Sequence, residues 1–217
     1  MLDVNDGLLD AIRSSPCPYA LRGRYVLGAR WDGPFPAVRH LDRLAKTLAE
    51  EAVKSKQERA DAIVAASLHD STGMTYQHLC QALLISLVGL HARDPLARRD
   101  LVADLPESLE SWDFTYRGVA YFVPAFSSIY DHDHPRRSDV PNMTYFLFQP
   151  EYAFRRFNIS SGRPHRRILS EQVHDRFVAG GRAYPIETTT DWPKIYRFIK
   201  PAKYDDGPIA WWLVEPE

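Results

Sequence analysis

The sequence predicts an α+β fold in a single domain over residues 1–217, with a mixed or antiparallel sheet and flanking helices. Long segments with helical hydrophobic spacing dominate the first half, whereas the second half holds short aromatic and β-branched runs typical of strands. No repeat and no shift in composition marks a domain boundary. A chain of 217 residues buries roughly 70% of its unfolded surface, which is enough for one core.

The first half predicts two helices around one buried strand. In Pro36–Arg59 apolar residues recur every three or four positions with charged residues between them, which indicates an amphipathic helix. Ala62–Ser67 is a short continuous apolar run that fits a buried strand. Thr72–Leu90 predicts a second, more deeply buried helix, with a hydroxyl side chain among residues 71–75 as its N-cap and Gly89 at its end.

The second half predicts a hairpin and a further strand. Asp113–Tyr116 and Val119–Phe126 are aromatic and β-branched, and Arg117-Gly118 between them predicts a tight turn. Thr144–Phe148 predicts a strand buried on both faces. Gln149-Pro150 is expected to end this strand, because proline cannot continue a hydrogen-bonded ladder.

The last predicted helix is His165–Val178, followed by two glycines at 180–181. Its expected apolar face consists of Ile168, Leu169, Val173 and Phe177. Arginines cluster between residues 155 and 167, a pattern that fits either a phosphate or carboxylate clamp or a solvated loop. The tail from Asp191 is rich in Trp, Tyr and Pro and has weak secondary-structure signals.

Charge and hydropathy exclude several classes of partner. The 27 basic and 28 acidic residues give a net charge of −1, which argues against a nucleic-acid-binding protein. The most apolar stretch, Leu79–Leu90, is too short for a bilayer, which takes about 20 residues, so we expect no membrane association. Met1–Arg13 has no basic segment of the kind that opens a signal peptide. Two cysteines, Cys17 and Cys80, fit a reduced cytoplasmic setting.

The common nucleotide, hydrolase and zinc motifs are absent from the sequence. It contains no GxGxxG or GxxxxGK[ST] loop, no GxSxG elbow and no CxxC pair. The candidate site residues therefore come from clusters without a standard signature.

The first cluster is built around Cys17. Pro16 and Pro18 fix a stiff, non-helical backbone on both sides of this cysteine. Such a backbone can present a thiolate to a metal or a cofactor. The alternative is a packed free cysteine in a turn.

The second cluster follows a predicted strand, at residues 130–138. His132 and His134 alternate with aspartates there, and imidazole ligates haem iron, non-haem iron or zinc. Arg136 and Arg137 are candidates for contacts with haem propionates or an anionic substrate. A solvated surface loop has the same composition, so both interpretations remain open.

Seven short motifs follow one another along most of the chain: Pro16–Ala20, Arg24–Val26, Trp112–Gly118, Tyr121–Ala125, His134–Ser138, Tyr145–Phe154 and Trp192–Tyr196. In this order they resemble the YqcI/YcgG-like family. Members of that family show a PC[PT]FA-type start, a W-x-F-x-x-x-G strand pair, an HP-x-x-S/R segment and an F-[QN]-P-x-x-x-F strand end.

The resemblance implies a haem-dependent monooxygenase. Characterised members of the family are haem proteins that hydroxylate nitrogen on guanidino substrates, so we expect haem b as cofactor, a small amine or guanidino substrate and an electron donor. His134 is the implied axial ligand of the iron, with His132 and Cys17 as alternatives. Arg136 and Arg137 are the implied contacts of the haem propionates.

Two other functions fit the same residues. One is a non-haem metal enzyme that uses His132, His134 and a carboxylate. The other is a haem-binding protein without catalytic activity.

Overall fold

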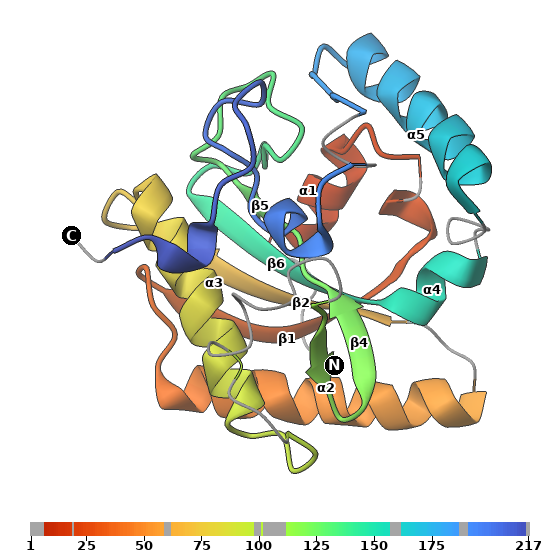
Figure 1. Ribbon diagram of the computed structural model, residues 1–217. Coiled ribbons are helices and arrows are strands. Elements are labelled where there is room, and N and C mark those ends of the chain that lie inside the picture. Colours follow the sequence, from red (N-terminus) through yellow and green to blue (C-terminus); the bar gives the residue numbers. More distant parts are fainter. Residues whose placement is uncertain are drawn as a thin grey trace.

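A computed structural model describes residues 7–18, 20–58, 62–97, 101, 112–156, 162–186 and 191–215. Helices flank a six-stranded mixed sheet, which confirms the predicted α+β class (Figure 1). The helices are α1 (Leu8–Ser14), α2 (Val38–Glu58), α3 (Tyr76–His91), α4 (Glu151–Arg156) and α5 (Gly162–Ala179), with 3-10 turns η1 (Ala20–Arg22), η2 (Lys194–Arg197) and η3 (Trp211–Leu213). The strands are β1 (Arg24–Asp32), β2 (Ala62–His69), β3 (Phe114–Tyr116), β4 (Val119–Phe122), β5 (Ala125–Ser127) and β6 (Met143–Pro150).

The sheet has the strand order β1-β2-β6-β4-β3, and β5 also pairs with β6. Strands β1 and β2 are parallel, joined through α2, and the remaining pairs are antiparallel. Strand β6 pairs with β2 through residues 143–148 and with β4 through Gln149 and Pro150. The strand therefore ends at Pro150, as expected for a proline stop, but it runs two residues past the predicted bound at Phe148, because Gln149 and Pro150 stay in register with β4.

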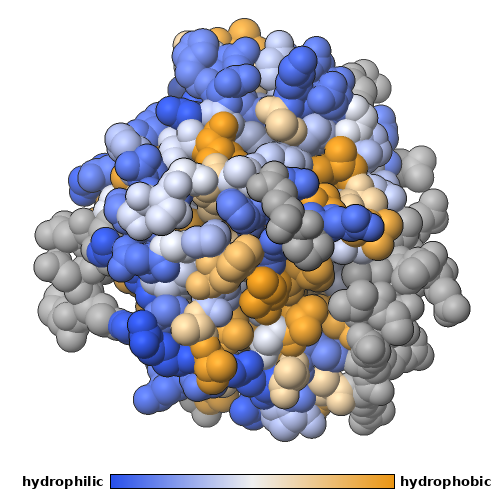
Figure 2. Space-filling model, turned by 90° about the vertical axis from the view of Figure 1, so that its left-hand side faces the viewer, coloured by the Kyte–Doolittle hydropathy of each residue, from blue (hydrophilic) through white to orange (hydrophobic). Residues whose placement is uncertain are grey.

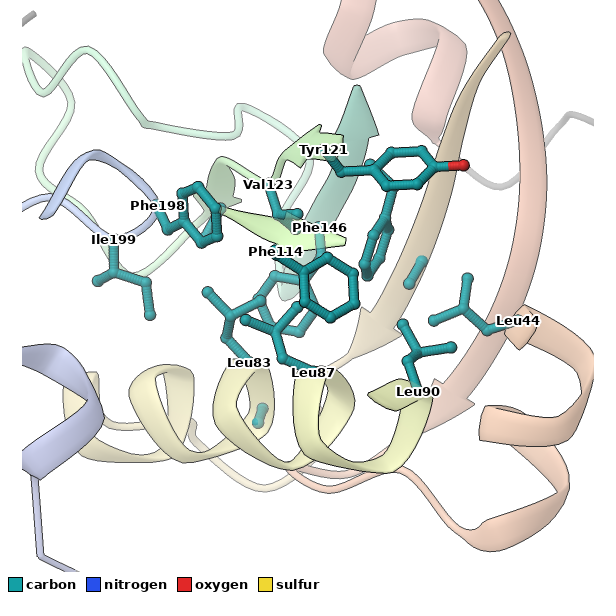
Figure 3. Close-up of a cluster of buried hydrophobic side chains, with 14 of the residues drawn as sticks. Leu44, Leu83, Leu87, Leu90, Phe114, Tyr121, Val123, Phe146, Phe198 and Ile199 are labelled. Atoms are coloured by element: carbon teal, nitrogen blue, oxygen red, sulfur yellow. The ribbon is translucent and has the colours of Figure 1, made fainter. Parts of the chain in front are cut away.

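Alternate residues of β2 and β6 point to opposite faces of the sheet, because side chains in a strand alternate. The first face, which we call the packed face, carries Val64, Ala66, Phe146 and Phe148 into a large apolar cluster. Leucines of α2 and α3 point into this cluster from the helix side, as Figure 3 shows for Leu44, Leu83, Leu87 and Leu90.

The opposite face, which we call the cleft face, carries a smaller apolar cluster. Ala65, Tyr145 and Leu147 of the sheet pack there against Leu8 and Ile12 of α1. This face supports the candidate site described below.

The two long predicted helices are confirmed. In α2 the predicted stripe is buried from Leu41 onward, whereas Val38 at the first turn is 67% exposed. Thr75 caps α3: its side chain accepts a hydrogen bond from the His78 backbone N–H at 3.2 Å, and the His78 ring accepts one from the Thr75 N–H. Gly89 does not end α3. A Cβ at this position would lie 2.5 Å from Leu41 Cδ1, so the glycine lets α2 and α3 pack closely.

The predicted hairpin is confirmed, with Arg117 and Gly118 both at positive φ (53° and 72°), as a type I′ turn requires. The run predicted as one strand after it is two strands, β4 and β5, separated by Val123-Pro124. Helix α5 buries Val173 and Phe177 as predicted, but Ile168 is 51% exposed and not on the buried face. The arginine side chains between 155 and 167 lie outside the described residues.

Hydrophobic residues also gather on one part of the surface. Figure 2 shows the side of the molecule where α3 and the C-terminal residues lie, with a hydrophobic patch surrounded by hydrophilic residues. Ile85 and Val88 of α3 and Leu213 of η3 are among the exposed large hydrophobic side chains. None of the helices that the structure describes combines the length and apolar character needed to cross a membrane.

Candidate functional site

Two cavities lie on the cleft face, and Cys17, Phe126 and Gln149 line both of them. The larger cavity has a volume of about 190 Å³ and mainly apolar walls from α1, β1, β2 and β6. The smaller has a volume of about 150 Å³ and combines aromatic walls with two basic side chains, Arg136 and Lys200. Together they reach the lower end of the range of about 300–1,000 Å³ typical of ligand pockets.

Cys17 lies where the two cavities meet. Its loop is fixed locally, because the Ser15 hydroxyl accepts a hydrogen bond from the Cys17 backbone N–H (3.3 Å) and the Cys17 carbonyl accepts one from Ala20 (3.1 Å). Pro16 packs against Gly180 at the end of α5, where a Cβ would lie 3.1 Å from the proline ring. The two flanking prolines thus hold a half-buried thiol on the wall of both cavities.

Arg136 provides the positive charge of the smaller cavity. Its guanidinium donates a hydrogen bond to the Arg197 carbonyl (3.0 Å) and lies over the Phe126 ring, 4.9 Å from the centroid. Burial lowers the pKa of Arg136 below its usual value. No carboxylate among the described residues pairs with this guanidinium. A desolvated cation of this kind favours an anionic ligand.

Arg137, the next residue, lines the larger cavity. Its guanidinium donates to the backbone carbonyls of Ser128 and Tyr130, which fixes the loop between β5 and β6. Neighbouring arginines therefore line different cavities, and Cys17 lines both of these cavities.

His134 points into the protein and is only 1% exposed. Its Nε2 lies 3.1 Å from the Pro201 carbonyl, and its Nδ1 accepts a hydrogen bond from the Arg136 backbone N–H at 3.0 Å. The ring also stacks on Tyr130, with centroids 4.0 Å apart and 3° between the planes. Burial, together with the Arg136 charge, lowers the pKa of His134 to about 3.

This geometry gives His134 a structural role in the ligand-free protein. A neutral ring that donates from Nε2 has one lone pair for a ligand, on Nδ1, and the Arg136 N–H already occupies it, so the ring offers no free lone pair to a cavity. His134 connects the loop after β5 to the segment after η2, 67 residues further along the chain.

His132, two residues earlier, is exposed and does not line either cavity. Within the part of the chain that the structure describes, no three His, Cys, Asp or Glu side chains are grouped so as to hold a metal ion. The structure thus brings Cys17, Arg136 and Arg137 together around the two cavities and leaves His132 and His134 outside them.

Lys200 is the site residue that sequence reasoning missed. It lines the smaller cavity, is 4% exposed and follows two fully buried residues, Phe198 and Ile199. A single lysine inside the run Phe198–Pro201 was the available signal, because a lysine flanked by buried apolar residues is seldom a surface residue.

No protein-family model, curated protein or solved structure matches this chain. The cleft and the motif resemblance are therefore the features that point to a function.

Proposed function

We propose that the cleft binds haem b and that the protein is a haem-dependent monooxygenase, with Cys17 as the axial ligand of the iron. The observation that carries this proposal is the shared wall of the two cavities, where a half-buried thiol lies beside a desolvated guanidinium and aromatic rings. These residues fit haem in chemical terms, because the group has an apolar ring, an iron that takes a thiolate, and two anionic propionates.

Each residue has a distinct task in this proposal. Cys17 would hold the iron through its thiolate, and Arg136 and Arg137 would hold the propionates by charge-assisted hydrogen bonds. Apolar side chains of the larger cavity, among them Ile12, Ile63 and Leu147, exclude water. Haem, when bound, supplies the oxygen chemistry, and a thiolate ligand favours cleavage of the O–O bond.

The proposed substrate is a small amino-acid-like amine or guanidine that is hydroxylated on nitrogen, as the motif resemblance implies. The lining residues that the structure describes include cations and the Gln149 amide but no carboxylate. This charge pattern offers no acidic partner to a cationic amine or guanidine beside the arginines, so the proposed substrate has its reacting nitrogen directed away from them.

Haem titration of three proteins tests the ligand assignment. We expect the wild type and His134→Gln to bind one haem per chain with the same spectrum, and Cys17→Ala to bind at least about tenfold more weakly with a changed spectrum. Loss of the spectrum in His134→Gln with an unchanged Cys17→Ala would assign the iron to His134 instead. A folded wild type that binds no haem would overturn the proposal.

Turnover separates the enzyme from a haem carrier. Haem-loaded protein supplied with a reductant and oxygen, or with peroxide, should convert a panel of amino acids and guanidines into N-hydroxylated products detected by mass spectrometry. Full haem loading without any product would support the non-catalytic haem-binding protein.

A further inference from the structure

The side chain of Lys200 lies inside the protein, on the wall of the smaller cavity. Its Nζ is 4.7 Å from the centroid of the Trp192 ring, and the residue is 4% exposed. Arg136 lines the same cavity, as do the rings of Phe122 and Phe177. A buried amine, a guanidinium and aromatic walls thus surround one space of about 150 Å³.

The backbone that carries Lys200 is held from two sides. Its carbonyl accepts hydrogen bonds from the hydroxyls of Tyr76 (2.6 Å) and Tyr130 (3.0 Å), and the next carbonyl, of Pro201, lies 3.1 Å from His134 Nε2. Tyr76 belongs to α3, whereas Tyr130 and His134 belong to the loop after β5. This amount of backbone fixation is unusual for an irregular tail and pre-orients the amine.

The surroundings also favour a neutral amine. Burial lowers the pKa of Lys200 to about 6, and the charges of Arg136 and Arg197 act in the same direction. A desolvated lysine beside another cation is a recognised way to obtain a nucleophilic amine near neutral pH.

We propose that Lys200 condenses with the carbonyl group of a small aldehyde or keto acid whose carboxylate is held by Arg136. The Lys200 nitrogen attacks the carbonyl carbon, a C–N bond forms, and the carbonyl oxygen leaves as water with the two amine hydrogens. The product is an imine, and no oxidant or reductant takes part. This inference stands on the smaller cavity and on Lys200 and does not depend on the haem proposal. It gives the cavity a different ligand, because Arg136 cannot hold a haem propionate and this carboxylate at the same time.

Reductive trapping on the purified full-length protein tests the inference. The protein is incubated near pH 7 with 4-carboxybenzaldehyde and sodium cyanoborohydride, and the modified lysine is located by peptide mapping and mass spectrometry. We expect one adduct per chain on Lys200, formed at least about tenfold faster than any adduct on the exposed Lys203.

Three variants and a second probe sharpen the result. Lys203→Arg should label like the wild type, and Lys200→Arg should lose the adduct while circular dichroism confirms its fold. Arg136→Gln should slow labelling by 4-carboxybenzaldehyde several-fold more than labelling by uncharged benzaldehyde, because only the first probe also loses its carboxylate contact. Adducts that form on Lys203 as fast as on Lys200, or a folded wild type with no adduct at all, would overturn the inference.

Discussion

The two faces of the sheet differ in what fills them. On the packed face, leucines of α2 and α3 interlock with aromatic rings such as Phe146 and Phe148, and this cluster accounts for most of the buried apolar residues (Figure 3). On the cleft face, α1 covers a much smaller cluster, and two cavities remain beside desolvated cations.

Because of this difference, we expect the two faces to contribute unequally to stability and to ligand binding. Filled apolar packing stabilises a fold, because both apolar transfer and dispersion favour it. Buried cations and unfilled volume have the opposite effect, and a protein tolerates them where a ligand supplies the missing charge and contacts. The packed face should therefore control unfolding, and the cleft face should control binding.

The largest expected effect is on the packed face. Phe148 is fully buried and makes edge-to-face contacts with Phe114 and Tyr121, so Phe148→Ala should lower the free energy of unfolding by about 3–5 kcal/mol. Phe126→Ala, on the half-buried cavity wall, should cost less than about half of that and weaken haem binding. Urea unfolding measures the free energy of unfolding of both variants. Equal losses would contradict the expectation that the packed face contributes more to stability than the cleft face.

The pH dependence of stability tests whether His134, which contacts the Pro201 carbonyl, is neutral in the folded protein. The folded pKa of His134, about 3, is below the unfolded value of about 6.5, so the unfolded chain holds more protons between these pH values. Stability should thus fall as the pH drops through this window, by about 1.4 kcal/mol per pH unit from His134 alone.

The matched variant for this prediction is His134→Gln, which keeps a donor and an acceptor but does not titrate. Urea unfolding at pH 7, 5.5 and 4 should show that the free energy of unfolding falls more steeply with decreasing pH in the wild type than in His134→Gln. Parallel curves for the two proteins would contradict a buried neutral His134.

A substitution of Arg136 tests whether the cleft face controls ligand binding and not stability. Arg136→Met removes a desolvated cation and keeps an apolar side chain, so the haem-free protein should be as stable as the wild type or gain about 1 kcal/mol. Haem affinity should fall at least about tenfold. A destabilised variant with normal haem affinity would make Arg136 a structural residue.

The smallest expected effect is at the N-cap of α3, Thr75, which lines neither cavity. Thr75→Ala removes the side-chain acceptor for the His78 N–H and should cost about 1 kcal/mol in urea unfolding. Haem affinity should stay unchanged, since the cap supports the packed face. A change in haem affinity as large as that of Arg136→Met would show that the faces are coupled.

Local patterns predicted the elements of the packed face well. The period of α2, the continuous apolar run of β2 and the Arg117-Gly118 turn are readable because each depends on residues close in sequence. Strand β1 was missed because Gly28 and Arg30 interrupt its hydrophobic pattern, although Gly28 is needed where a Cβ would lie 2.6 Å from Leu44 Cδ1. Pairing with β2, rather than local composition, defines that strand.

The site was predictable in its residue types but not in its geometry. Prolines around Cys17 and the pair Arg136-Arg137 indicated binding chemistry from sequence alone. His134 is turned toward the Pro201 carbonyl and not toward a cavity. The hydroxyls of Tyr76 and Tyr130 fix the backbone of Lys200 by donating hydrogen bonds to its carbonyl. These contacts join segments far apart in sequence, and no local pattern encodes them.

The absorbance spectrum of the reduced, CO-bound protein, expressed with iron and a haem precursor, tests iron ligation by Cys17 most directly. We predict a Soret band at the long wavelength characteristic of thiolate ligation, present in His134→Gln and lost in Cys17→Ala. A CO-bound band of the kind given by histidine ligation, or a featureless spectrum after haem titration, would contradict the account.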